Sequence, residues 1–168
     1  MLRLRPPRPD EEAVFRVAHE QMAAEGFAFA FGLEPGTEWL AYLRALAGRR
    51  VGADLPEGWV PETFLVADVE GQIVGRVSIR HELTDFLRDE GGHIGYCVLP
   101  SYRRRGYATE ILRQALIIAR SVAVDRVLIT CDDDNEGSIK VIESCGGKLE
   151  SVRPATPDAP GLRRYWVD

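Results

Sequence analysis

The sequence predicts a mixed α/β fold, in which a central and mostly antiparallel sheet carries helices on both faces. Two observations lead to this prediction. Short apolar runs bounded by turn residues indicate strands, and segments with apolar residues at helical spacing lie between them. The expected order of elements is β α α β β β α β α β β. A length of 168 residues suits a single domain over 1–168, which can bury a core without metal or disulfides.

In the first third of the chain, a short strand over residues 2–5 precedes a helix that Asp10 caps and that extends to Gly26. A second helix covers about residues 37–47. Residues 27–31 alternate with a period of two, which is typical of a strand. Their position between two helical patterns argues against a strand there.

The remaining boundaries follow from turn and cap residues. Glu70-Gly71 forms the turn of a hairpin, Pro100 ends a strand, and Gly146 closes a helix through a left-handed cap. In order, we expect strands 63–69 and 73–80, a connector 81–91, strand 94–99, helix 106–120, strand 126–131, helix 135–145, and strands 148–153 and 163–167. Strand 94–99, its helix and strand 126–131 form a right-handed crossover unit.

Composition and charge exclude several classes of protein. The longest uncharged apolar run covers residues 115–119, which is far too short to cross a bilayer, and the first residues lack the apolar segment of a secretory signal. A net charge of −5 argues against binding to nucleic acid or to an anionic membrane. Three cysteines without CxxC spacing predict neither a zinc site nor disulfides, so we expect a cytoplasmic protein without metal.

The most informative segment lies between strand 94–99 and the following helix. It contains three consecutive arginines, then Gly106 and the small Ala108 at the helix start. Free backbone amides and the dipole at a helix N-terminus favour an anion such as pyrophosphate. A solvated basic turn would give the same pattern. The glycine spacing fits neither the dinucleotide fingerprint nor the P-loop.

This segment resembles the acyl-CoA pyrophosphate loop of the GNAT family of N-acetyltransferases. The residues that carry the resemblance are Arg103-x-x-Gly106-x-Ala108 after a strand that ends Val98-x-Pro100, followed by Asn135-x-x-Ser138 at the start of the next helix. Residues 91–96 and 129–135 are similar to a subgroup of predicted acetyltransferases. The resemblance implies the acyl-CoA N-acyltransferase fold, with strand 94–99 splayed from strand 126–131.

The resemblance also implies an activity. An acetyl group would move from acetyl-CoA, the cosubstrate, to a primary amine by direct attack in a ternary complex. The amine could belong to a small molecule or to a peptide. Residues implied to hold the cosubstrate are Cys97, Val98, Arg103, Arg104, Arg105, Gly106, Tyr107, Ala108, Thr109, Asn135 and Ser138. Asn135 could equally cap its own helix.

The catalytic acid and base stay open at this level. Many family members carry a tyrosine seven residues after the asparagine, and here that position is Ile142. Tyrosines elsewhere in the chain, among them Tyr96, are candidates for the acid that protonates the leaving thiolate. Candidates for the base are His93, which begins a strand beside the predicted cleft, and the pair His81 and Glu82.

Two other functions are compatible with the sequence. Without the usual tyrosine, the chain could be a non-catalytic acyl-CoA sensor, and the basic loop could bind a different nucleotide. Six aromatic residues could line an acceptor pocket or fill the core; these are Phe27, Phe29, Phe31, Trp39, Tyr42 and Trp59. A homodimer is the expectation from base rates alone.

Overall fold

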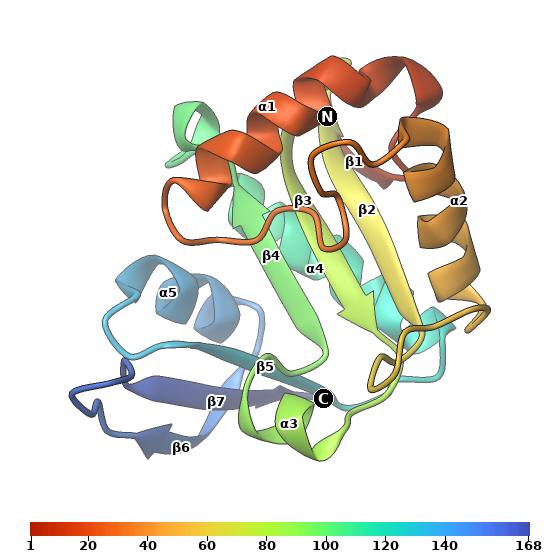
Figure 1. The fold of residues 1–168 in the computed structure, drawn as a ribbon. Coiled ribbons are helices and arrows are strands. Elements are labelled where there is room, and N and C mark those ends of the chain that lie inside the picture. The colour runs from red at the N-terminus through yellow and green to blue at the C-terminus, as the bar shows by residue number, and fades with distance from the viewer.

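A computed structural model describes all residues, 1–168, and contains two antiparallel sheets that meet at an angle (Figure 1). The first sheet has the order β1-β2-β3-β4 and the second has the order β5-β7-β6. The strands are β1 (Leu2–Arg5), β2 (Glu62–Val69), β3 (Gln72–Arg80), β4 (Ile94–Val98), β5 (Val127–Asp132), β6 (Lys148–Arg153) and β7 (Leu162–Val167). The predicted fold class is confirmed, and the sheet divides between β4 and β5.

The helices cover both faces of the first sheet (Figure 1). They are α1 (Glu12–Ala23), α2 (Trp39–Arg50), α3 (Asp85–Asp89), α4 (Tyr107–Ser121) and α5 (Glu136–Ser144), with 3-10 turns at Pro9–Glu11 and Pro100–Tyr102. Helix α3 lies within the segment that the sequence predicts as a plain connector. It forms because the Thr84 hydroxyl accepts a hydrogen bond from the Leu87 amide at 3.2 Å and because the Leu87 side chain is buried.

Two hydrophobic cores hold the layers together. One lies between α4 and the sheets, where Ile111, Leu112 and Ala115 pack with apolar residues of β3, β4 and β5. The other lies under α1 and α2, where Phe15 and Phe64 pack with part of the aromatic cluster that the sequence singled out. Phe29, Trp39 and Tyr42 belong to this second core, Phe27 packs at its edge, and Phe31 and Trp59 stay partly exposed.

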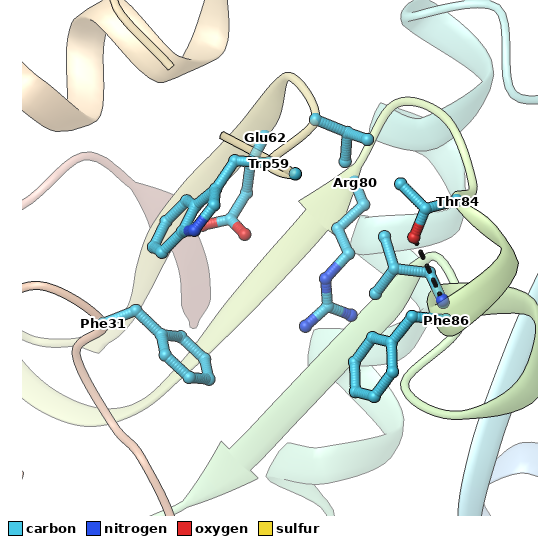
Figure 2. A pocket seen from close by; sticks show the side chains of 9 residues that line it. Phe31, Trp59, Glu62, Arg80, Thr84 and Phe86 are labelled. Atoms are coloured by element: carbon cyan, nitrogen blue, oxygen red, sulfur yellow. Dashed lines mark hydrogen bonds between the residues drawn. The ribbon is translucent and has the colours of Figure 1, made fainter. Parts of the chain in front are cut away.

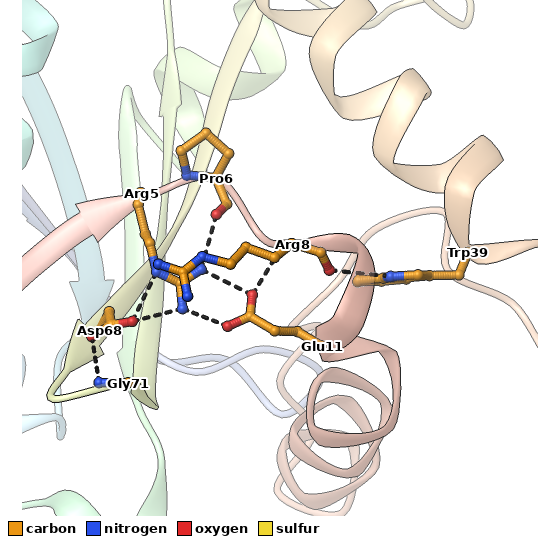
Figure 3. Close-up of polar contacts among 7 residues, drawn as sticks. All are labelled: Arg5, Pro6, Arg8, Glu11, Trp39, Asp68 and Gly71. Carbon is orange, nitrogen blue, oxygen red and sulfur yellow. Dashed lines mark hydrogen bonds and ion pairs between the residues drawn. The ribbon is translucent and has the colours of Figure 1, made fainter.

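A polar network fastens β1 and the N-terminus of α1 to the first sheet (Figure 3). The Arg5 guanidinium donates to Asp68 at 2.8 Å and also pairs with Glu11. These contacts raise the pKa of Arg5 and lower that of Glu11. The Trp39 indole N–H donates to the Pro9 carbonyl at 3.0 Å, which anchors the start of α2 to the same corner. None of the helices is both long and apolar enough to span a membrane.

Candidate active site

The strands β4 and β5 touch at one end only, just before β4 begins. The His93 amide donates to the Leu128 carbonyl at 2.7 Å, and the Leu128 amide donates to Nδ1 of His93 at 2.9 Å. Gly92 permits this approach, because a Cβ there would lie 2.4 Å from the Leu128 carbonyl oxygen. Beyond this junction β4 and β5 are not hydrogen-bonded, so β4 has one free edge, as the resemblance implied.

The free edge of β4 presents backbone groups to the space between the sheets. The Leu99 amide donates to Val74 on β3, and neighbouring residues in a strand direct their amides to opposite sides. The amides of Val98 and Tyr96 are therefore directed away from β3, toward β5. The Val98 carbonyl accepts from Nε of Arg103 at 3.1 Å, which agrees with this direction. An extended ligand with amide groups can pair with such an edge.

The loop that follows β4 has the properties of an anion site. The amide N–H groups of residues 104–109 donate no hydrogen bond within the chain. Gly106 precedes the first turn of α4 with a φ of 80°, and Arg104 has a φ of 63°. Glycine adopts this left-handed conformation without the steric penalty that a Cβ brings. Consecutive free amides at a helix N-terminus form a concave site for phosphate groups.

The three arginines of this loop differ in their side-chain contacts. Arg103 turns back to the Val98 carbonyl and forms an ion pair with Glu25 at 2.5 Å. The Arg105 guanidinium donates to the Ser101 carbonyl at 3.2 Å and lies over the Tyr102 ring. Arg104 makes no ion pair or side-chain hydrogen bond. Its guanidinium is the one that is free to meet a bound phosphate.

The Tyr96 side chain extends from β4 toward the start of α5. The Asn135 side chain accepts from the Ser138 amide at 3.0 Å, so it caps its own helix. The Tyr96 hydroxyl is buried without a hydrogen bond, close to Ser138 of α5 and Cys131 of β5. Burial raises the pKa of Tyr96, so this phenol keeps its proton. Ile142, one turn after Ser138, is fully buried in the core.

The bases that the sequence suggested lie in different surroundings. The Nδ1 lone pair of His93 is engaged by the Leu128 amide, and burial lowers the pKa of this imidazole to about 4. Nε2 of His81 lies 2.8 Å from the Thr63 hydroxyl, and burial lowers its pKa as well. Glu82 is exposed to solvent. The structure does not bring these groups together around one point.

Next to β4, a cavity of about 360 Å³ opens under the loop between α1 and α2 (Figure 2). Arg80 and Glu62 are cross-strand neighbours and both line it. Nη1 of Arg80 donates to the carbonyls of Gly91 and Gly92, and a Cβ at Gly95 would lie 3.9 Å from the same atom. The lining residues are Phe31, Gly58, Trp59, Val60, Glu62, Arg80, Thr84, Phe86 and Leu87. Through Arg80, the cavity therefore lies close to Gly95 of β4.

Sequence reasoning missed Glu62. It is the first residue of β2, it precedes the apolar run 64–67, and its side chain is buried. The carboxylate forms no hydrogen bond and no ion pair. A charged residue at the start of a buried strand was the available signal, because such groups are seldom buried without a partner.

Comparison with known proteins identifies the family. The profile of the acetyltransferase (GNAT) domain matches residues 1–148. The chain belongs to the GNAT acetyltransferase family. A search of curated protein sequences gives no match.

Several solved structures share the GNAT fold with this chain. The microcin C7 self-immunity acetyltransferase MccE, bound to acetyl-CoA and AMP, is 16% identical, with a TM-score of 0.72 over 99% of this chain and 91% of that one. RimJ of Mycobacterium smegmatis, with CoA-disulfide, is 20% identical, with a TM-score of 0.70 over 99% and 81%. Spermidine N-acetyltransferase of Vibrio cholerae, with CoA and spermine, is 16% identical, with a TM-score of 0.66 over 99% and 94%.

Proposed function

We propose that this GNAT protein transfers an acetyl group from acetyl-CoA to a primary amine by direct attack in a ternary complex. The observation that carries the proposal is the run of free amides at residues 104–109, which leads directly to the free edge of β4. Pyrophosphate suits the first feature, and an arm with amide groups suits the second. MccE, which has the same fold, is known with acetyl-CoA bound.

The residues divide into those that bind the donor and those that move protons. The amides of residues 104–109 and the Arg104 guanidinium would hold the pyrophosphate. The amide of Tyr96 or Val98 would donate to the thioester carbonyl oxygen, where negative charge develops when the amine attacks. Asn135 would contribute by fixing the first turn of α5, since its oxygen already accepts from Ser138.

Direct attack forms a C–N bond at the thioester carbon and breaks the C–S bond. The attacking nitrogen must lose a proton, and the departing thiolate gains one. Glu62 is suited to accept the first proton, because its carboxylate lines the cavity without a partner. Tyr96 is suited to supply the second, because its buried phenol stays protonated beside α5. His93, whose Nδ1 lone pair is engaged, would position β5 instead.

A covalent acyl-enzyme route through cysteine has less support. Cys97 and Cys131 are buried, and burial raises the pKa of Cys131 to about 11. A thiol in such an environment stays protonated and is a weak nucleophile. Direct attack by the amine needs no such group.

One specific observation favours a second candidate, a non-catalytic acyl-CoA sensor. The residue at the usual position of the acid tyrosine is Ile142, which is fully buried and cannot donate a proton. A sensor would bind acetyl-CoA and release no CoA in the presence of amines. Turnover separates the two functions.

The test combines calorimetric titration with acetyl-CoA and detection of the free CoA thiol over a panel of amines. We expect micromolar binding and amine-dependent thiol release. Gly106→Ala should weaken binding by about fivefold, because the left-handed conformation that presents the loop amides then costs on the order of 1 kcal/mol. Gly71→Ala is the matched control, since Gly71 has a φ of 84° in the β2–β3 turn and no neighbour within 4 Å of a Cβ.

Each result of this experiment has a distinct meaning. Binding that Gly71→Ala keeps and Gly106→Ala weakens supports the assignment of the cosubstrate loop. Absence of acetyl-CoA binding, or equal binding of ATP, would refute it. Binding without thiol release from any amine would favour the sensor.

A further inference from the structure

We propose that the acceptor is an α-amino acid with an apolar or aromatic side chain, whose carboxylate binds Arg80 and whose amino group faces Glu62. The inference rests on the proposed acetyl transfer and names the substrate class for the same site. Its basis is the buried positive charge near the cavity and the position of Arg80 directly opposite Glu62 on neighbouring strands of its wall.

One arginine lines the cavity and two more lie close to it, all without a carboxylate partner: Arg80 is in the wall, Arg49 lies over the ring of the lining residue Trp59, and Arg76 is on the same strand as Arg80. Arg49 and Arg76 are buried, Arg80 lines the wall, and none of them forms an ion pair with an acidic residue. Backbone carbonyls satisfy part of their hydrogen-bonding capacity but leave their charge in place. Arg49 donates to Phe31 at 3.1 Å, and Arg76 donates to Ala28 at 2.6 Å, Phe29 at 3.0 Å and Gly95 at 3.0 Å.

This local charge is the opposite of the net charge of the chain, which is −5. Burial lowers the pKa of Arg76 and of Arg80, and the negative charge of the nearby Glu62 offsets only part of this effect. Glu62 is the only carboxylate in the cavity lining. A bound anionic group would therefore relieve an uncompensated cost of burial.

Arg80 is the arginine that a ligand in the cavity can contact. Figure 2 shows its guanidinium directed into the space between Phe31 and Phe86. Nη1 is engaged by the Gly91 and Gly92 carbonyls, whereas Nη2 and Nε donate no hydrogen bond. Free guanidinium N–H groups bind a carboxylate through short, charge-assisted hydrogen bonds.

Glu62 supplies the complementary charge for the amino group. It is the direct cross-strand neighbour of Arg80, yet no nitrogen of Arg80 lies within 4.0 Å of a Glu62 oxygen. An α-amino acid carries an ammonium group and a carboxylate on one carbon atom. These two groups match Glu62 and Arg80, which line the same cavity and form no ion pair with each other. A polyamine would instead place a second positive charge near Arg80.

The remaining walls suit an apolar side chain. Phe31, Trp59 and Phe86 are exposed by 41%, 37% and 68%, which is high for residues so close to one another. The Phe31 and Trp59 rings pack edge to face at 6.4 Å, and Phe86 lies across the cavity (Figure 2). An aromatic or branched aliphatic side chain would bury this surface.

The first test measures binding in the presence of saturating CoA. Two probes with the same apolar body are compared, 3-phenylpropanoate and 3-phenylpropylamine. Trp59 fluorescence reports occupancy, and Trp59→Phe assigns the signal because Trp39 lies in the core and Trp166 in the second sheet. We expect the carboxylate to bind at least about tenfold more tightly, as one charge-assisted contact provides. Equal binding, tighter binding of the amine or no binding of the carboxylate would overturn the proposal.

The second test measures kcat/KM for acetylation of phenylalanine, phenethylamine and spermidine. The kcat/KM for phenylalanine should exceed that for each of the other two amines by about tenfold or more. Arg80→Gln should remove this preference, and Arg80→Lys should restore part of it because the charge returns. Arg88→Gln is the matched control, since Arg88 is exposed on α3 outside the cavity lining. A preference that survives Arg80→Gln would contradict the assignment of the carboxylate contact.

Failure of the proposed function gives a different result. If the chain does not bind acetyl-CoA, the donor site is wrong. If it binds acetyl-CoA and acetylates phenethylamine or spermidine as well as phenylalanine, the acetyl transfer stands and the α-amino acid is wrong.

Discussion

His93 and Leu128 are joined by hydrogen bonds in both directions, one from the His93 amide and one to its imidazole ring. This pair is the junction at which β4 leaves β5. In a continuous sheet the Leu128 amide would donate to a backbone carbonyl of the neighbouring strand. Here Nδ1 of the His93 ring accepts that hydrogen bond instead. The imidazole thereby fixes where β4 and β5 begin to diverge.

Removal of this ring should destabilise the chain. His93→Leu leaves the buried Leu128 amide without an acceptor, which costs about 1–3 kcal/mol. His93→Asn should lose much less of the free energy of unfolding, because the asparagine side-chain oxygen can occupy the place of Nδ1 and accept from the Leu128 amide. Urea unfolding at pH 8 gives both values. Equal losses for the two variants would show that packing, and not the hydrogen bond, is what His93 provides.

The same residue predicts how stability depends on pH. The pKa of His93 is about 4 in the folded chain and near 6.5 in the unfolded chain, so the unfolded chain binds more protons between these values. Its contribution is complete above pH 6.5 and is lost as pH falls toward 4, by at most about 3 kcal/mol.

Urea unfolding from pH 4.5 to 8 measures this dependence. His93→Asn cannot titrate and should show a flatter profile than the wild-type chain. Burial also lowers the pKa of His81, so His81→Asn serves as the companion variant for the remaining slope. A wild-type slope that both variants keep would contradict the prediction.

Tyr96→Phe should reduce kcat while leaving the KM for acetyl-CoA nearly unchanged. The substitution removes the one hydroxyl group, and the reduction should be about 10- to 100-fold, within the range of general acid catalysis for a thiolate that leaves readily. Tyr165→Phe is the control, because it also removes the hydroxyl group of a buried tyrosine. That hydroxyl group already donates to Glu143 at 3.1 Å, so its loss should leave kcat nearly unchanged. Steady-state kinetics decides, and an unchanged kcat for Tyr96→Phe would exclude the phenol as the acid.

Neighbouring arginines in the phosphate loop should differ in their effect on binding. Arg104→Ala should weaken acetyl-CoA binding by about 3- to 10-fold at low salt. The effect should be smaller at 0.5 M salt, because salt screens the attraction between the exposed guanidinium and a phosphate group. Arg105→Ala should have a smaller effect, since its side chain is held by Ser101 and the Tyr102 ring. Titration at both salt concentrations measures this difference, and equal losses would contradict it.

Much of the fold could be predicted from local patterns. Helix α4 was predicted to within one residue at each end, because its buried positions Ile111, Leu112 and Ala115 repeat at helical spacing. The turn at Glu70-Gly71 was also correct, since both residues have positive φ. Helix α3 was missed because a single turn, capped by Thr84, has too few residues for a periodic pattern.

The candidate site could be predicted only in part. The proposed phosphate loop could be suggested from the sequence, because an anion site made of backbone amides depends on a local helix start and on glycine. The sequence left the contacts of individual side chains open. Asn135 was suggested equally as a ligand of the cosubstrate and as a helix cap, and in the structure it caps α5, whereas Arg103 turns toward Glu25. The cytoplasmic location and the homodimer stay predictions.

The sequence by itself indicated the order of the elements, the family and the basic loop before α4, because each of these depends on residues close together in the chain. Only the tertiary structure decided which groups surround the cavity. Glu62 and Arg80 are separated in sequence and meet through the register of β2 and β3. Whether a charged group is paired, buried or free depends on such long-range contacts, and no local pattern records them.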